Sequence, residues 1–211
     1  MDKATLQLLA KCKLIHIEPS PRLAEALEGV LHEDGILDIR HLPSAGRIAE
    51  KPPTLDTDVI LIDFDHDVAD GLDLVHGLRT GQYGADPFMV IVGTQSDTSR
   101  ELVREEVRAG LDIILKKPFS AADLIDHIGM LARRPRRFAL AKSYIGPDRR
   151  DNPRIGTEWE TFIAPNRLTL RAGDRLKTDD VSNWLTAWRG MVADLDAGRP
   201  IMDRLPVPVF L

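Results

Sequence analysis

The stretch that decides the fold reads Asp58-Val59-Ile60-Leu61-Ile62-Asp63-Phe64-Asp65-His66-Asp67-Val68-Ala69-Asp70-Gly71-Leu72-Asp73. Its apolar part, residues 59–62, is short and rich in β-branched side chains, which is typical of a strand buried on both faces. The run breaks abruptly into carboxylates, so Asp63 comes at the carboxyl end of that strand. Ligands of open α/β sheets bind outside the carboxyl ends of the strands. Asp63 is therefore a candidate reactive group.

Short apolar runs alternate with amphipathic stretches along the first 133 residues. The expected strands are 14–17, 36–39, 58–63, 88–92 and 111–115. Helices are expected from Pro21, over 44–51, from Asp70, over 99–109 and after Ser120, which opens a capping box. Five strands alternating with five helices imply parallel βαβ units with right-handed crossovers. The sequence thus predicts an α/β fold with a flavodoxin-like, doubly wound five-stranded parallel sheet of order 2-1-3-4-5.

Four polar or charged side chains follow the carboxyl ends of strands in this sheet. They are Glu18, Asp63, Thr94 and Lys117. Because parallel strands end at one edge of the sheet, we expect these residues to converge in a single cleft.

These residues and their neighbours resemble the receiver domain of bacterial two-component response regulators, over roughly residues 13–132. The fragments that carry the resemblance are 17–21, 61–63, 70–72, 92–94 and 117–119. It implies that Asp63 accepts a phosphoryl group from a phosphohistidine on a sensor histidine kinase or phosphotransfer protein. It also implies that Thr94 hydrogen-bonds to the phosphoryl oxygens and that Lys117 pairs with their charge. Phosphoryl transfer needs this kind of positioning and cationic stabilisation.

The first departure from the family pattern concerns the metal site. The family has two adjacent acids after the first strand, the second of which binds Mg²⁺ directly, whereas this chain has Glu18 and Pro19. Proline offers no carboxylate, but Mg²⁺ usually keeps several waters and one of these can replace the lost ligand. We therefore expect weak Mg²⁺ binding through Asp63, the backbone carbonyl of Asp65 and Glu18.

The second departure is Ile114, which stands three residues before Lys117, where the family has an aromatic switch residue. An aliphatic side chain cannot swing a hydroxyl or a ring edge in the same manner. Together the two departures keep open a pseudo-receiver, in which the fold survives and the phosphorylation chemistry is reduced.

Other sites are less well supported by the pattern around Asp63. An EF-hand loop would need glycine at Val68 and glutamate at Leu74. Haloacid-dehalogenase-like phosphatases also use an Asp-x-Asp motif after a strand, but that reading leaves Glu18 and 117–119 without a role. The six histidines lack metal-ligand spacing, and His66 is expected to be a solvent-exposed loop residue. The chain is therefore not expected to be an enzyme.

Composition restricts the partners and the compartment. The chain has 211 residues, a formal net charge of −5 and a single cysteine, Cys12. Nucleic acid is thus not expected as a partner, and no intrachain disulfide can form. No apolar run is long enough to span a bilayer and the N-terminus does not resemble a signal peptide. A cytoplasmic protein without membrane insertion is expected.

Three segments are expected along the chain: a receiver over 1–133, a basic irregular linker over 134–177, and an amphipathic helix with an apolar tail over 178–211. The helix carries Trp184 and Trp188 on one apolar stripe, which must be covered by the receiver, by a second copy in a homodimer, or by another protein. The sequence therefore favours a response regulator whose output is protein–protein interaction through this extension. The alternative is a scaffold or adaptor that works without phosphorylation.

Overall fold

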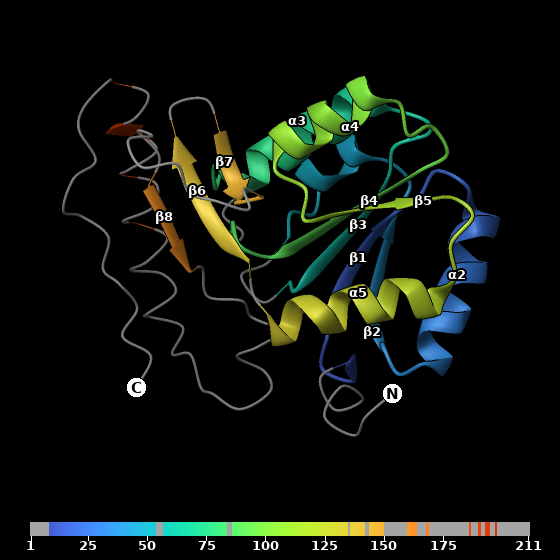
Figure 1. The fold of residues 1–211 in the computed structure, drawn as a ribbon. Coiled ribbons are helices and arrows are strands. Elements are labelled where there is room, and N and C mark those ends of the chain that lie inside the picture. The colour runs from blue at the N-terminus through green and yellow to red at the C-terminus, as the bar shows by residue number, and fades with distance from the viewer. Residues whose placement is uncertain are drawn as a thin grey trace.

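A central sheet of five parallel strands organises the protein (Figure 1). The computed structural model describes residues 9–53, 57–83, 86–134, 136–141, 144–149 and 160–163, and residues 168, 186, 190, 193, 194 and 197. The strands are β1 (Lys13–Ile17), β2 (Asp38–Leu42), β3 (Val59–Asp63), β4 (Val90–Gln95) and β5 (Ile113–Lys116). Their order is β2-β1-β3-β4-β5, so the flavodoxin-like topology expected from the sequence is confirmed.

Helices cover both faces of the sheet, as Figure 1 shows. One face carries α2 (Pro21–Glu33) and α5 (Ala121–Arg133), and the other carries η1 (Ala45–Ala49), α3 (Val68–Arg79) and α4 (Arg100–Ala109). The second of the five expected helices is thus only a short 3₁₀ helix. Prolines at 52 and 53 stop any extension of that turn, because they cannot donate the hydrogen bonds of a longer helix.

Side-chain caps fix where the helices begin. The hydroxyls of Ser20, Ser99 and Ser120 each accept a backbone N–H three residues ahead, and Ser120 completes a capping box with Asp123. The helix expected from Asp70 starts earlier, at Val68, because the carboxylate of Asp67 accepts the N–H of Asp70. These local bonds satisfy N–H groups that a helix leaves free at its first turn.

The second strand lies two residues later than expected. Ile36 is fully buried, which explains the apolar signal, but its N–H donates to the carbonyl of Leu31 at 2.9 Å. That bond keeps Ile36 in the turn that closes α2, where Gly35 has a φ of 103°. The sheet pairing therefore starts only at Asp38.

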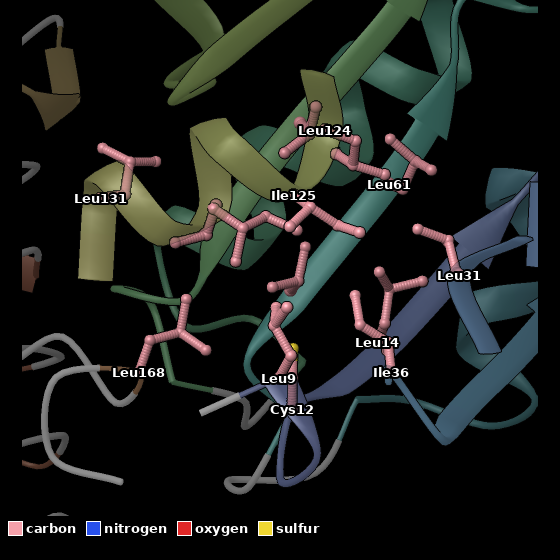
Figure 2. Packing of buried hydrophobic residues seen from close by; sticks show 14 of the residues in the cluster. Leu9, Cys12, Leu14, Leu31, Ile36, Leu61, Leu124, Ile125, Leu131 and Leu168 are labelled. Atoms are coloured by element: carbon pink, nitrogen blue, oxygen red, sulfur yellow. The ribbon is translucent and has the colours of Figure 1, made fainter. Parts of the chain in front are cut away.

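The core lies in two layers, one on each side of the sheet. Strand β3 contributes side chains to both layers. Leu61 belongs to the cluster under α2 and α5, whereas Ile60 and Ile62 belong to the cluster under α3. Figure 2 shows the first cluster, with Leu124 of α5 and Leu31 of α2 among its members. All five residues of β3 are buried. The expectation of a strand buried on both faces is confirmed.

The segment after α5 differs from the expected irregular linker. Its described residues include β6 (Arg137–Ala141), β7 (Tyr144–Pro147) and β8 (Glu160–Ile163), which form an antiparallel sheet of order β7-β6-β8. The arginines and prolines of this segment suggested a solvated linker, but Phe138 on β6 is buried edge-on against Phe88, with ring centroids 4.9 Å apart. Contact with the receiver thus supplies a core that the local sequence does not reveal.

One buried arginine links this second sheet to the receiver. The guanidinium of Arg79, at the end of α3, donates to the Gly110 carbonyl at 2.8 Å and to the Asp112 carboxylate at 2.7 Å, and lies 5.1 Å from the centre of the Phe138 ring. Arg149, beyond β7, donates to the carbonyls of residues 111 and 112. The extension therefore packs on the receiver near the end of α4 and the start of β5.

Residues 186, 190, 193 and 194 of the expected late helix are described and are helical, whereas Trp184, Trp188 and the apolar tail lie outside the described residues. The division of the chain at residues 133 and 177 stays a prediction. Within the described part of the chain, no helix has the length and apolar character needed to cross a membrane.

Candidate functional site

The sheet brings the predicted site residues together at its carboxyl edge. Asp63 is the last residue of β3 and pairs in register with Thr94 on β4. Glu18 directly follows β1, and Lys117 directly follows β5. The topology thus accounts for this cleft, since each residue comes after a parallel strand.

Asp63 is the centre of the site. Its side chain is only 1% exposed. One carboxylate oxygen, Oδ1, accepts the Lys117 ammonium at 2.8 Å and the backbone N–H of Asp65 at 2.9 Å. The other, Oδ2, lies 2.9 Å from Nδ1 of His66. Buried charge is tolerated here because both oxygens have partners.

Lys117 is shared between two carboxylates. Its ammonium also lies 3.1 Å from Oδ2 of Asp65. Partial burial would lower the pKa of Lys117, but hydrogen bonds and charge attraction from Asp63 and Asp65 outweigh it, so its pKa is raised. The ammonium therefore remains a fixed positive charge beside Asp63.

Asp65 makes a second set of contacts with the end of β4. Its Oδ1 accepts the backbone N–H of Ser96 at 2.6 Å, and its Oδ2 accepts the Ser96 hydroxyl at 2.9 Å. Partial burial raises the pKa of Asp65, but these bonds and Lys117 lower it by more, so the net pKa lies below its ordinary value. The Asp65 carboxylate is thus bound to Ser96 and Lys117, and the expected contribution of its backbone carbonyl to a metal site stays a prediction.

Glu18 occupies a buried position although it is charged. Its side chain Oε1 accepts the N–H of Ser20 at 2.9 Å, which also orients the turn that begins α2. Among the described residues, Glu18, Asp63 and His66 form a group whose donor atoms all lie within 4.8 Å of one another. Two carboxylates of this group suit a divalent cation, whereas Pro19 provides no side-chain ligand.

Thr94 points its hydroxyl at the backbone. Its Oγ1 donates to the Ile62 carbonyl at 3.4 Å, and the residue is buried. Ile114, in the position of the family's switch residue, is partly buried against the cluster under α3. The hydroxyl of Thr94 would have to turn about its χ1 bond to contact a group on Asp63.

An apolar groove adjoins the charged cleft and was not expected from the sequence. It has a volume of about 450 Å³ and includes Thr94 and Lys117. Its apolar walls come from α2, from the turn before α5 and from the first residue of α5, and are formed by Leu23, Ala26, Leu27, Val30, Pro118, Phe119 and Ala121. Leu23 is 55% exposed, so part of the wall faces solvent.

One site residue and one contact were not predicted from the sequence. His66 is the solvent-exposed loop histidine that was expected, with 54% of its side chain exposed, but its contact with Asp63 was not predicted. Ser96 was not singled out, although it lies two residues after Thr94 at the same sheet edge. Its position after Thr94 was the one feature of the sequence that could have indicated a site residue. Its contact with Asp65 depends on the loop conformation, which the pattern of apolar residues does not predict.

Three solved structures are similar to this fold. The receiver domain of Francisella response regulator 1452 is 24% identical, with a TM-score of 0.50, 58% of this chain covered and 98% of that one. A pilus assembly protein candidate, cpaE, from Burkholderia thailandensis E264 is 18% identical, with a TM-score of 0.50 and coverages of 58% and 99%.

The third structure is the receiver domain of sensor histidine kinase PA1611 from Pseudomonas aeruginosa PAO1, solved with magnesium in its active site cleft. It is 22% identical, with a TM-score of 0.47 and coverages of 56% and 95%. No curated protein matches the sequence. The family model for the response regulator receiver domain matches residues 14–129, which is more than half of the chain. The chain therefore belongs to the response regulator receiver domain family, the receivers of two-component signalling.

Proposed function

We propose that this protein is a response regulator that accepts a phosphoryl group on Asp63 from a sensor histidine kinase or a phosphotransfer protein. The observation that carries the proposal is the contact of Lys117 with Asp63 at 2.8 Å, at the carboxyl edge of the sheet. A buried carboxylate with a fixed cation beside it provides positioning and charge stabilisation, which are the main needs of phosphoryl transfer.

In the proposed step, Oδ1 of Asp63 attacks the phosphorus of a phosphohistidine. The new O–P bond forms as the P–N bond breaks, and the electron pair of that bond returns to the imidazole of the donor. Lys117 already lies at Oδ1, so its ammonium is placed to pair with the arriving phosphoryl oxygens. A divalent cation at Glu18 and Asp63 would neutralise further charge in this step.

Release of the donor leaves a dianionic group on Asp63. The modification adds about −1.5 to −2 charge close to Asp65, whose carboxylate shares Lys117. Repulsion between the phosphoryl group and Asp65 favours a rearrangement of the Asp65–Ser96 contact at the end of β4. We propose that Thr94 turns toward the phosphoryl oxygens in the same movement, and that the change is read by another protein.

The proposed output is protein–protein interaction through the extension, with no enzymatic activity of its own. Support comes from the packing of β6 and β7 on the receiver near α4. The helix with Trp184 and Trp188 is proposed to bind the downstream protein or a second copy of the chain. This part of the proposal rests on the sequence.

The test of phosphorylation is incubation of the full chain with acetyl phosphate and a divalent cation, followed by Phos-tag electrophoresis. A retarded band is expected for the wild type and for Asp73→Asn, in which an exposed carboxylate of α3 is removed. No retarded band is expected for Asp63→Asn. Equal labelling of wild type and Asp63→Asn would refute Asp63 as the acceptor.

A scaffold that works without phosphorylation is the second candidate function. It is favoured by Pro19, which removes a metal ligand, and by Asp65, whose contacts to Lys117 and Ser96 are complete without a phosphoryl group. The scaffold predicts that Asp63→Asn leaves partner capture unchanged while Trp184→Ala with Trp188→Ala abolishes it. A phosphorylation-dependent output predicts that Asp63→Asn alone weakens or deregulates capture.

A further inference from the structure

We propose that Glu18, Asp63 and His66 together bind a first-row transition metal ion of the Zn²⁺ class in preference to Mg²⁺. The inference rests on the proposed function for its role, because the ion would serve phosphoryl transfer to Asp63. It departs from the Mg²⁺ site that the family implies, since one of the three donors is an imidazole nitrogen.

The donor set separates the two classes of ion. Mg²⁺ takes oxygen ligands and demands near-ideal octahedral geometry. Imidazole suits Zn²⁺, Co²⁺ and Ni²⁺, and the affinity of a mixed N/O site rises along the first-row series toward copper. Pro19 withholds the oxygen donor that would have favoured Mg²⁺. His66 offers a nitrogen on the exposed side of the same carboxylate.

The distances suit a common ion. Two ligands that bind one Zn²⁺ tetrahedrally at about 2.0–2.1 Å lie about 3.3 Å apart, so the two donor atoms would have to separate by about 0.4 Å. The separation of His66 Nδ1 from Asp63 Oδ2 is 2.9 Å, so the ion would replace the proton of the present hydrogen bond. The widest separation in the group is below 4.8 Å, and a small inward movement of one side chain closes it.

The side chains of Glu18 and Asp63 are fixed by their surroundings, whereas that of His66 is free to change its rotamer. Glu18 and Asp63 are 4% and 5% exposed, and the Ser20 N–H orients the Glu18 carboxylate at 2.9 Å. Such outer contacts fix the direction of a metal ligand. The side chain of His66 is 54% exposed and can therefore turn to complete the site. Three protein ligands with open positions for water or substrate are the arrangement of reactive zinc sites.

Lys117 is compatible with an ion at this position. Its ammonium lies on Oδ1 of Asp63, whereas the ion would bind at Oδ2, beside His66. The positive charge of Lys117 is also shared with Asp65 at 3.1 Å, which reduces its repulsion of a cation. The two oxygens of Asp63 thus have separate tasks: Oδ2 binds the metal and Oδ1 is left to attack phosphorus.

The test is metal titration of the tag-free, chelator-treated full chain without any phosphodonor. We expect one Co²⁺ per chain, with visible d–d absorption that Zn²⁺ abolishes, and Mg²⁺ binding at least about 100-fold weaker by calorimetry. His66→Gln should weaken Zn²⁺ binding by at least about 10-fold and Mg²⁺ binding by much less. His76→Gln, which removes an exposed histidine of α3, should bind Zn²⁺ as the wild type does.

A second variant tests the metal preference by adding an oxygen donor. Pro19→Asp restores an oxygen donor and should strengthen Mg²⁺ binding while His66 is kept. Mg²⁺ that binds as tightly as Zn²⁺ to the wild type, or Zn²⁺ binding that is equal in His66→Gln, overturns the inference. Either result leaves phosphorylation of Asp63 to be judged by electrophoresis alone, so the failure of one proposal is distinguishable from failure of the other.

Discussion

The Arg79 guanidinium lies 2.7 Å from the Asp112 carboxylate in an ion pair whose side chains are 0% and 6% exposed. Three backbone carbonyls, at Pro87, Met89 and Gly110, accept three more of its N–H groups. Arg79 therefore joins the end of α3, the start of β4 and the start of β5 with one side chain. A buried charge with this many partners is tolerated, but it is costly when one partner is removed.

We expect Arg79→Leu to lower the free energy of unfolding by about 3–5 kcal/mol, because Asp112 would be left buried without its cation. Urea denaturation measures the change. Arg47→Ala is the matched control: Arg47 pairs with Glu50 at 2.8 Å on the surface, and its loss should cost less than about 1 kcal/mol. Equal costs for the two variants would contradict a structural role for the buried pair.

Phe138→Ala should loosen the extension without unfolding the receiver. The Phe138 ring contacts Phe88 and the Arg79 guanidinium, so its truncation removes apolar burial and a cation–π contact between the two sheets. Hydrogen exchange should show faster exchange in β6 and β7, with β1 and β3 still protected.

Phe119→Ala is the control for that experiment. Phe119 is a partly buried ring in the groove beside Lys117, away from β6. Its variant should leave protection of β6 and β7 unchanged. Uniform loss of protection across both sheets in Phe138→Ala would show instead that the extension and the receiver unfold as one unit.

Glu106 makes the stability of the folded protein depend on pH. The residue is 0% exposed on α4, and neither carboxylate oxygen has a well-formed hydrogen bond among the described residues. Burial raises its pKa to about 7, while the nearby Gln95 amide and the positive charge of Arg149 offset this only in part. Because the folded state prefers the protonated acid, the stabilisation is fully present below about pH 4.5 and is lost as the pH rises through about 7.

Glu106→Gln should remove this dependence and raise stability above pH 7 by roughly 2–3 kcal/mol, since the amide carries no charge to bury. Thermal or urea unfolding at pH 5 and pH 8 measures it as a difference from the wild type. Glu105→Gln, which alters the exposed neighbour, should keep the wild-type pH profile. A Glu106→Gln profile parallel to that of the wild type would contradict the assignment.

Lys117→Met should slow phosphorylation of Asp63 by about 10²–10³-fold, the usual cost of removing one preorganised charge-stabilising group. The initial rate with acetyl phosphate is the measurement. Lys116→Met changes the exposed lysine immediately before it and should leave the rate unchanged. If the two variants were labelled equally fast, the contact between Lys117 and Asp63 would have no part in the transfer.

Much of the receiver fold could be predicted because its signals are local. Val59 to Ile62 are apolar on both faces, and Ser20 and Ser120 cap helices through bonds to residues three positions ahead. The sheet β7-β6-β8 could not be predicted, since the burial of Phe138 depends on Arg79, which is distant in the sequence.

The candidate site could likewise be predicted only in part from the sequence. Asp63 and Lys117 follow strands, so the sheet topology alone places them together. The contacts of His66 with Asp63 and of Ser96 with Asp65 depend on loop conformations and side-chain rotamers, which carry no period in the sequence. The sequence therefore predicts the groups that the topology positions, but not the contacts that depend on a loop conformation.

The close approach of Gly146 on β7 to Gly110 at the end of α4 has a mechanical consequence. A Cβ atom added at Gly146 would lie 2.9 Å from Cα of Gly110, so backbone rests directly on backbone here. No side chain is present at either position to absorb a displacement by changing its rotamer. A tilt of α4 would therefore be transmitted directly to the backbone of β7, and the second sheet would move together with α4.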